Sequence, residues 1–256
     1  MRFANVVELA TVDSTNRYAA DAVRAGAEDG LVVVAVEQTA GRGRRGRSWL
    51  APAGGALLCS VVVRPRLELG SLQLVGAALG LAALDAVAAT THATARLKWP
   101  NDVVVGEKKL AGILAELVDR PNGTFVVVGI GLNCAFPPGW VDEALTDEGR
   151  PLAELATTLA AEAGAAPAMD GLLVALLVAF DGWLAVLERR TGPAAFVEAY
   201  RLACATVGQL VEVTTPLRRF AGRATAIAPD GRLEILGPDG PLLLDAGDVV
   251  HVRGGG

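Results

Sequence analysis

Histidine and cysteine are scarce in this chain, and their positions exclude several kinds of site. Only 2 His and 3 Cys occur among 256 residues. His92 and His251 lie far apart, so neither a His-x-x-x-His metal site nor a histidine-based catalytic triad is expected. Cys59, Cys134 and Cys204 form no Cys-x-x-Cys pair and are odd in number, which argues against a zinc ribbon or a disulfide framework. A reducing compartment fits this pattern best.

A surplus of positive charge is also missing. The 23 Lys and Arg residues face 28 Asp and Glu residues, which gives a formal net charge of -5 and an isoelectric point near 5.2. Proteins that coat nucleic acid are usually basic, so this class of function is disfavoured from the start. The length corresponds to between one and two domains of roughly 150 residues, enough to bury a sizeable core.

Long apolar runs are absent too, although the mean hydropathy of +0.41 is positive. A helix needs about 20 predominantly apolar residues to cross a bilayer. The charge-free runs at 69–84 and 121–141 are interrupted by glycine and polar residues, and the second also by a Pro-Pro pair. Near the N-terminus, Glu8 and Asp13 interrupt the apolar residues. We therefore expect no membrane-spanning helix, no signal peptide and a cytoplasmic location.

The spacing of apolar residues predicts an α+β fold up to about residue 205. Ser14-Thr15-Asn16 stands before a pattern with helical spacing, which predicts a helix near 15–25. Further helices are predicted at 71–89, 152–163, 169–188 and 193–203. Strands are predicted at 31–36, 56–63, 96–99, 103–105, 110–118 and 124–133. Because successive strands this close together pair antiparallel, the sheet is expected to be largely antiparallel.

The pattern changes near Val207, after which only short strands are predicted. They are expected at 209–213, 221–227, 233–235, 242–244 and 249–252, with Asp230-Gly231 and Asp239-Gly240 as hairpin signals. About fifty residues of this kind make a small β-barrel that is too slight to carry much chemistry alone. We therefore predict two domains, 1–205 and 206–256, and a frayed end at Gly254–Gly256.

A glycine- and arginine-rich segment, GRGRRGR, runs from Gly41 to Arg47. Glycine lets the backbone approach a ligand closely, and arginine offers a rigid fork of donors to carboxylates and phosphates. By itself such a run is also typical of a solvated or RNA-binding loop. Here it follows a predicted strand directly and ends at Ser48-Trp49, inside a folded domain. This context favours an ordered loop that closes over a small anionic ligand.

The segment KWPND, Lys98 to Asp102, places polar side chains at a turn between two strands. Pro100 forces Trp99 into an extended conformation and presents Asn101 and Asp102 at the tip. An ordinary hairpin in which both side chains satisfy their own backbone is the alternative. Lys109 then enters an apolar strand, where an unpaired ammonium is costly. It is expected to meet an anionic partner or ligand, unless the side chain extends to solvent.

A third segment, GIGLN, contains two glycines that share one face of a predicted strand. Gly129 and Gly131 follow the two-residue period, so their missing side chains would open a flat slot for a ligand ring. A bulge or tight packing is the alternative explanation for such a pair. Asn133, at the end of the strand, could bind a polar group.

Taken together, these segments resemble the biotin protein ligases, the biotin-[acetyl-CoA-carboxylase] ligase family, across nearly the whole chain. The matching residues are Ser14-Thr15-Asn16, Gln38 before GRGRRGR, Ser48-Trp49, KWPND, KLAGIL with Glu116, GIGLN and the pattern from Val207 to Arg253. Their order and spacing make the match specific. The resemblance implies a catalytic domain of the class II synthetase-like type, α+β around a mixed sheet, followed by a small C-terminal SH3-like β-barrel.

The resemblance also implies a reaction in two steps. Biotin and ATP first give biotinyl-5'-AMP and pyrophosphate, with Mg²⁺ offsetting the triphosphate charge. The biotinyl group then passes to one lysine of a biotin carboxyl carrier domain in a biotin-dependent carboxylase. Because the substrate carboxylate is the nucleophile in the first step, no protein nucleophile is required, and positioning and charge neutralisation carry the chemistry.

By the same resemblance, three groups of residues acquire expected roles. The biotin site would contain Ser14, Thr15, Asn16, Gln38, Gly41, Arg42, Gly43, Arg44, Lys109, Gly129 and Gly131. The ATP site would contain Arg44, Arg47, Trp49, Lys98, Asn101, Asp102 and Asn133. Arg44, Lys109 and Asp102 would be catalytic, with Asp102 orienting or deprotonating the acceptor lysine. No residues are assigned to the metal.

Three alternatives follow from these patterns. Some larger family members carry an N-terminal DNA-binding domain and act as repressors. Here the Ser-Thr-Asn segment begins at residue 14, so a ligase without operator binding is expected.

Two alternative functions are considered. A lipoate ligase, which uses the same adenylation chemistry, is the nearer one, and a nucleic-acid-binding module using the arginine loop and Trp49 is the more distant one. Pairing into a homodimer stays open.

Overall fold

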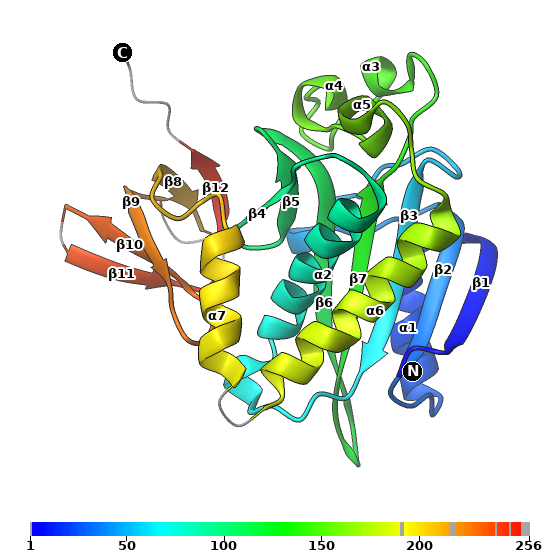
Figure 1. The fold of residues 1–256 in the computed structure, drawn as a ribbon, viewed down its shortest axis with the longest axis horizontal. Helices are drawn as coiled ribbons and strands as arrows, with labels where there is room; N and C mark the ends of the chain where they lie inside the picture. Colours follow the sequence, from blue (N-terminus) through cyan, green and yellow to red (C-terminus); the bar gives the residue numbers. More distant parts are fainter. Residues whose placement is uncertain (1, 190–191, 216–218, 239, 246, 252–256) are drawn as a thin grey trace.

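The computed structural model describes residues 2–189, 192–215, 219–238, 240–245 and 247–251. Within them lie a seven-stranded sheet and a separate five-stranded sheet, with helices packed on both faces of the larger one (Figure 1). Asp239 of one predicted hairpin, Val252-Arg253 and the terminal glycines fall outside the described residues. The prediction of a mixed α+β fold is confirmed.

The large sheet is almost entirely antiparallel. Its strand order is β1-β2-β3-β7-β6-β5-β4. The strands are β1 (Asn5–Val12), β2 (Leu31–Gln38), β3 (Ala56–Val63), β4 (Arg96–Lys98), β5 (Asp102–Val105), β6 (Lys108–Arg120) and β7 (Gly123–Asn133). Only β1 and β2 pair in parallel. The central strands are apolar along their whole length because both faces are covered, as all eight buried residues of β3 illustrate.

The edge strand β1 was missed by the sequence prediction. Its residues are mostly exposed or half-buried, so the apolar pattern that marks a buried strand is weak there. Helix α1 (Thr15–Arg24) makes the crossover that a parallel β1–β2 pair requires. This helix packs on one face of the sheet through Ala19, Ala20 and Val23. The crossover places the first turn of α1 beside the end of β2.

Two long helices, α2 (Leu74–Thr90) and α6 (Met169–Leu187), cover the other face (Figure 1). Alanine and glycine along α2 allow close packing, and a Cβ on Gly80 would meet Leu97 Cδ2 at 3.0 Å. Helix α6 buries Leu172, Leu176, Phe180, Leu184 and Leu187 at helical spacing. This layer closes the main core.

Helix α6 corrects the expectation that no segment could cross a membrane. By length and composition alone, this helix is apolar enough to do so. The helix contains no long charge-free run, because Asp170 and Asp181 interrupt its apolar residues. In this fold, Leu172, Phe180 and Leu184 are fully buried in the core that α6 shares with α2. The apolar character of α6 is thus explained by its place in the core.

The segment after β7 also departs from the prediction. The single helix expected at 152–163 is broken into α4 (Leu152–Leu155) and α5 (Leu159–Ala163), and a short α3 (Trp140–Glu143) precedes them. Thr158 ends the break by capping α5, since its hydroxyl accepts a hydrogen bond from the Ala161 N–H at 3.1 Å. The Thr157 N–H donates to the Lys109 carbonyl at 2.9 Å, which ties this segment to β6.

The C-terminal part begins with α7 (Gly192–Ala203) and continues as an antiparallel sheet of order β11-β10-β9-β8-β12. Its strands are β8 (Leu210–Thr214), β9 (Arg219–Ile227), β10 (Leu233–Gly237), β11 (Gly240–Leu244) and β12 (Asp248–His251). All five correspond to predicted strands. The sheet meets the larger one at the β4–β5 turn, because the Trp99 indole N–H donates to the Gly231 carbonyl at 3.0 Å.

Candidate active site

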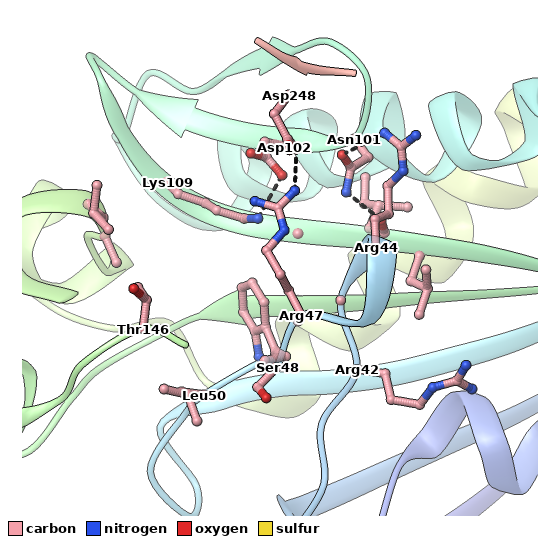
Figure 2. Close-up of a pocket in the computed structure, with 18 of the residues that line it drawn as sticks. Arg42, Arg44, Arg47, Ser48, Leu50, Asn101, Asp102, Lys109, Thr146 and Asp248 are labelled. Atoms are coloured by element: carbon pink, nitrogen blue, oxygen red, sulfur yellow. Dashed lines mark hydrogen bonds and ion pairs between the residues drawn. The ribbon is translucent and has the colours of Figure 1, made fainter. Parts of the chain in front are cut away.

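A cavity of about 520 Å³ lies between the large sheet, the arginine loop and β12 (Figure 2). Of the sequence-predicted site residues, it collects Ser14, Thr15, Asn16, Gln38, Arg42, Gly43, Arg44, Arg47, Trp49, Lys98, Asn101, Asp102, Lys109, Gly129, Gly131 and Asn133. Gly41 lines a second, shallower groove on the outer side of the arginine loop. Segments predicted separately from the sequence therefore converge on one space.

The arginine loop, Gly41 to Arg47, folds as a compact turn. Its centre is a short 3-10 helix, Arg44–Gly46, in which Arg45 takes a left-handed conformation with φ of 59°. The Trp49 N–H donates to the Gly41 carbonyl at 2.9 Å, which closes the base of the loop. A Cβ on Gly41 would lie 2.5 Å from the Trp49 carbonyl oxygen, so this close approach requires glycine.

Each arginine of the loop has a partner on a different part of the fold. Arg42 pairs with Glu116 of β6 at 2.8 Å, and Arg44 donates to Asn101 Oδ1 at 3.3 Å. Arg45 lies 2.9 Å from Asp248, and Arg47 pairs with the same carboxylate. In Figure 2 Arg47 reaches toward Asp248, while Arg42 points away from this group.

Among the described residues, no carboxylate makes a hydrogen bond with Arg44, in contrast to the other three arginines. Burial lowers its pKa, which Asp248 and Asp102 oppose and which Arg47 and Arg45 reinforce. A partly buried guanidinium held only by a neutral amide retains donors for an incoming anion. Arg44 is therefore the guanidinium best placed to receive one.

Lys109 and Asp102 meet at the centre of the cavity (Figure 2). Lys109 Nζ lies 2.7 Å from Asp102 Oδ1 and 5.4 Å from the centroid of the Trp49 ring. The two residues come together because β5 and β6 are hairpin neighbours, with Asp102 opposite Gly112. The expectation that Lys109 has an anionic partner is confirmed.

The KWPND turn is held rigidly from both sheets. The Trp99–Pro100 peptide bond is cis. The Trp99 N–H donates to Thr206 Oγ1 at 3.1 Å, and Asn101 Nδ2 donates to the Ile113 carbonyl at 2.8 Å. Burial lowers the pKa of Lys98, while nearby Asp102 raises it. The turn is thus more than a hairpin that satisfies its own backbone, since it presents Lys98 and Asp102 to the cavity.

The opposite end of the cavity is neutral and polar. The Thr15 N–H donates to Gln38 Oε1 at 2.7 Å, where the first turn of α1 meets the end of β2. Asn16 lies beside Thr15 and is only 4% exposed. Asn133, at the end of β7, lies instead on the Lys109 side of the cavity, where its Nδ2 is 3.5 Å from the Lys109 carbonyl oxygen and donates to the Thr157 carbonyl at 3.0 Å. Its buried Oδ1 makes no hydrogen bond with any described residue.

The prediction of an open slot at Gly129 and Gly131 was wrong. Both glycines share a face as expected, but a Cβ on Gly131 would lie 2.3 Å from Trp49 Cε2. A Cβ on Gly129 would lie 2.0 Å from Asn16 Oδ1. The space left by the missing side chains is therefore occupied by Trp49 and Asn16. The glycines are needed for this close packing, and both still line the cavity.

Two acidic residues of the site had no signal in the sequence. Asp248 anchors Arg45 and Arg47 from β12. Asp147 accepts the Ser48 N–H at 2.6 Å, and hydrogen bonds from Ser48 lower its pKa. Each lies far along the chain from its partner and within no recognisable motif, so only the folded structure reveals them.

The cysteines do not supply a nucleophile. Burial raises the pKa of Cys59 to about 12 and that of Cys134 to about 11. Both thiols therefore stay protonated at neutral pH and are poor nucleophiles.

The cavity combines a cationic end, built from Arg44, Lys98 and Lys109, with a neutral amide and hydroxyl end. Such an arrangement suits a ligand with an anionic part and an uncharged polar part.

Comparisons with known proteins give this cavity a context. The pattern of the Biotin/lipoate A/B protein ligase family matches residues 8–133. A Biotin–[acetyl-CoA-carboxylase] ligase from Mycobacterium tuberculosis is 38% identical over 254 residues, which cover 96% of this chain and 88% of that protein. A protein of the same name from Paracoccus denitrificans is 35% identical, covering 94% of this chain and 98% of its own length.

A solved structure agrees with these sequences. The biotin protein ligase from Aquifex aeolicus in complex with biotin and ATP has a TM-score of 0.81 to this chain at 28% identity, covering 98% of this chain and 100% of that one. Identity of 38% along nearly the whole length of the chain, together with this shared fold, shows that the chain belongs to the biotin protein ligase family.

Proposed function

We propose that this chain is an ATP-dependent ligase that activates biotin as biotinyl-5'-AMP and transfers it to a lysine of a biotin carboxyl carrier domain, as in acetyl-CoA carboxylase. The names of its relatives and the ligands of the Aquifex aeolicus structure support this assignment. The observation that carries it is the single cavity in which Arg44, Lys109 and Asp102 face a neutral floor of Thr15 and Gln38.

In the first step, a carboxylate oxygen of biotin attacks the α-phosphorus of ATP. A new P–O bond forms, the bond to the β-phosphate oxygen breaks, and pyrophosphate leaves with the electron pair. Arg44 and Lys109 neutralise the negative charge that would otherwise keep the two anions apart. For this, Lys109 exchanges its contact with Asp102 for the biotin carboxylate, a short movement because both groups lie in the same cavity.

In the second step, the neutral amine of the acceptor lysine attacks the acyl carbon of biotinyl-5'-AMP. The C–N bond forms, the C–O bond to phosphate breaks, and AMP leaves. The amine must lose a proton, and Asp102 is the carboxylate nearest to this centre. Once Lys109 has turned to the acyl group, Asp102 is free to accept that proton or to orient the amine.

Mg²⁺ is expected to accompany the triphosphate. Among the described residues, no group of three or more His, Cys, Asp or Glu side chains is placed to hold a metal. Within the described chain, the buried Asn133 Oδ1 makes no hydrogen bond, and Asp102 Oδ1 has Lys109 Nζ at 2.7 Å as its partner. Mg²⁺ prefers oxygen ligands completed by water and phosphate. Asp102 and Asn133 would therefore hold the ion, which would offset phosphate charge.

The C-terminal domain, the cellular location and the roles of the site residues are part of the same proposal. We propose that residues 206–256 form a separate C-terminal domain of the SH3-like barrel type, a reading supported by the all-antiparallel order of its five strands. A cytoplasmic location is proposed because biotin-dependent carboxylases and ATP would both be available there. The site roles listed for biotin and ATP are proposed for the residues that line the cavity.

The proposed reaction is tested by isotope exchange between pyrophosphate and ATP. Exchange that depends on biotin and not on lipoate would support a biotin ligase, and transfer to a biotin carboxyl carrier domain would complete the test. Exchange with lipoate alone would favour a lipoate ligase. If the chain bound single-stranded nucleic acid tightly and ATP not at all, the ligase proposal would be overturned.

Replacing Asp248 with alanine is expected to raise the KM for ATP. Asp248 fixes Arg45 and Arg47 from β12, so its loss leaves the arginine loop without one of its anchors. Partly exposed ion pairs contribute at most about 1 kcal/mol each, so the increase is roughly fivefold if one of the two pairs matters and at most about thirtyfold if both do. Steady-state kinetics at low and high ionic strength measure the effect, which salt should diminish.

Asp245→Ala is the matched control for this variant. Asp245 directly follows β11 of the same sheet, is mostly exposed and lies 3.6 Å from Arg232. Its removal should leave the KM for ATP unchanged. Equal KM values for the Asp248 and Asp245 variants would show that the C-terminal sheet does not support the loop.

A further inference from the structure

A buried hydroxyl that does not line the cavity lies directly beneath its polar floor. Ser60 is in the middle of β3, is 0% exposed, and faces α1 between apolar neighbours. Its Oγ lies 2.7 Å from both Thr15 Oγ1 and Asn16 Oδ1. A buried hydroxyl is costly unless its hydrogen-bonding capacity is used. The hydrogen available on each neighbouring donor decides which way the hydrogen bonds of Ser60 run.

The orientation of the Asn16 amide is fixed by two partners that can only accept. Asn16 Nδ2 lies 3.1 Å from the Leu114 carbonyl oxygen and 2.9 Å from Glu116 Oε2. Turning the amide over would place Oδ1 against a carbonyl and a carboxylate, both of which repel it. Asn16 therefore donates twice through Nδ2, and its Oδ1 accepts from Ser60.

This fixes the direction of the remaining hydrogen bonds. Ser60 has one hydroxyl hydrogen, which goes to Asn16 Oδ1, so the 2.7 Å contact between Ser60 Oγ and Thr15 Oγ1 must hold the Thr15 hydrogen. The other acceptor within reach of the Thr15 hydroxyl, Gln38 Oε1, lies farther away, at 3.0 Å. Gln38 Oε1 then keeps the backbone N–H of Thr15 at 2.7 Å. Among the described residues, no hydrogen bond engages Gln38 Nε2. The floor thus offers a ligand an acceptor at Thr15 Oγ1 and donors at Gln38 Nε2.

We propose that Ser60 is a positioning residue that fixes this polarity. The inference rests on the proposed function, because an acceptor beside a donor is the pattern that pairs with an N–H and a C=O of the biotin ureido ring. Gly129 lies opposite Ser60 in the sheet, and a Cβ there would come within 2.8 Å of Ser60 Oγ and 2.0 Å of Asn16 Oδ1. The absence of a side chain at Gly129 therefore leaves room for these hydrogen bonds.

Glu116 ends the same series of hydrogen bonds and connects it to the arginine loop. It accepts from Asn16 through Oε2 and binds Arg42 with both oxygens, at 2.8 and 3.2 Å. Glu116 lines the outer groove and not the main cavity. One carboxylate thus fixes both the floor, through Asn16, and the first arginine of the loop. The structure assigns Glu116 a positioning role as well.

Two substitutions test the proposal, and both are expected to change the KM for biotin rather than the KM for ATP. Ser60→Ala leaves Asn16 Oδ1 without a donor, and Glu116→Gln removes the charge that holds Arg42. Each is expected to raise the KM for biotin about tenfold, the scale of one buried hydrogen bond, while the KM for ATP changes less than twofold. Glu116 is partly exposed, so its variant is informative even if Ser60→Ala folds poorly.

Matched controls lie on the same strands. Cys59→Ala truncates the neighbouring buried residue of β3, which faces α2 and the main core instead. Asp119→Asn neutralises a carboxylate of β6 that pairs with Thr124 at 2.7 Å. Neither touches the series from Gln38 to Arg42, so both should keep the wild-type KM for biotin.

A second readout separates positioning from a general loss of packing. In Ser60→Ala the Thr15 hydroxyl loses this acceptor, and its hydrogen becomes available to Gln38 Oε1, 3.0 Å away, or to a ligand. The variant should therefore discriminate severalfold less against cyclic carbamate analogues, in which oxygen replaces one ureido N–H of biotin. A biotin KM and an analogue preference equal to those of Cys59→Ala would overturn the proposal. Failure of the proposed function would instead appear as wild-type protein without biotin-dependent exchange.

Discussion

Lys109→Ala is expected to slow biotin-dependent exchange of pyrophosphate into ATP by about 10²–10³-fold, the usual effect of removing one donor aimed at developing charge. Lys109 is the ammonium at the centre of the cavity, 2.7 Å from Asp102 and above the Trp49 ring. Its loss leaves the biotin carboxylate and the phosphates without this neutralising charge. Asp102 would then add a negative charge where two anions must meet.

Lys108→Ala is the natural control, because Lys108 is the preceding residue of β6 but points elsewhere. Its Nζ donates to the Ala153 carbonyl of α4 at 2.9 Å. Exchange should stay near the wild-type rate in this variant. The proposed role of Lys109 would be refuted by wild-type exchange in a Lys109→Ala protein whose melting temperature shows that it is folded.

Arg44→Ala is expected to reduce the same exchange by about 10²–10³-fold through loss of phosphate neutralisation. Arg44 is partly buried in the cavity wall, and among the described residues its side chain is held only by Asn101, at 3.3 Å, so its remaining donors are available for phosphate oxygens. Arg44→Lys should recover little activity, because an ammonium lacks the planar fork that binds two oxygens at once. Single-turnover formation of biotinyl-5'-AMP measures the step directly.

Arg45→Ala separates this role from the general stability of the loop. Arg45 is the next residue, but it does not line the main cavity, and its guanidinium reaches Asp248 and the Thr214 carbonyl. Its removal should cost no more than roughly the fivefold expected for an exposed ion pair. Equal losses in the Arg44 and Arg45 variants would indicate that the arginines act only by holding the loop together.

The parts of the site that the sequence predicted are those built by local geometry. Asp102 and Lys109 are close in the chain, and a hairpin between them forces the two side chains together. A lysine on an apolar strand also favours a charged partner, because an unpaired ammonium is costly among apolar side chains. Chain proximity and the cost of burial were therefore sufficient to predict this contact.

The parts that could not be predicted depend on distant segments. The two-residue period places Gly129 and Gly131 on one face but does not reveal what fills the space above them, which is Asn16 and Trp49. The edge strand β1 was missed because its residues lack a continuous buried face. The break between α4 and α5 depends on a backbone contact to Lys109, which helical periodicity does not encode.

The anchoring of Arg45 and Arg47 by Asp248 also has a consequence for synthesis of the protein. The loop is translated about 200 residues before Asp248, an interval of about 10–40 s at the usual elongation rates of 5–20 residues per second. During this time the large sheet can form on the ribosome, but the arginines have no carboxylate from β12. The chain should therefore reach its full affinity for the nucleotide only after the C-terminal sheet has left the ribosome and folded.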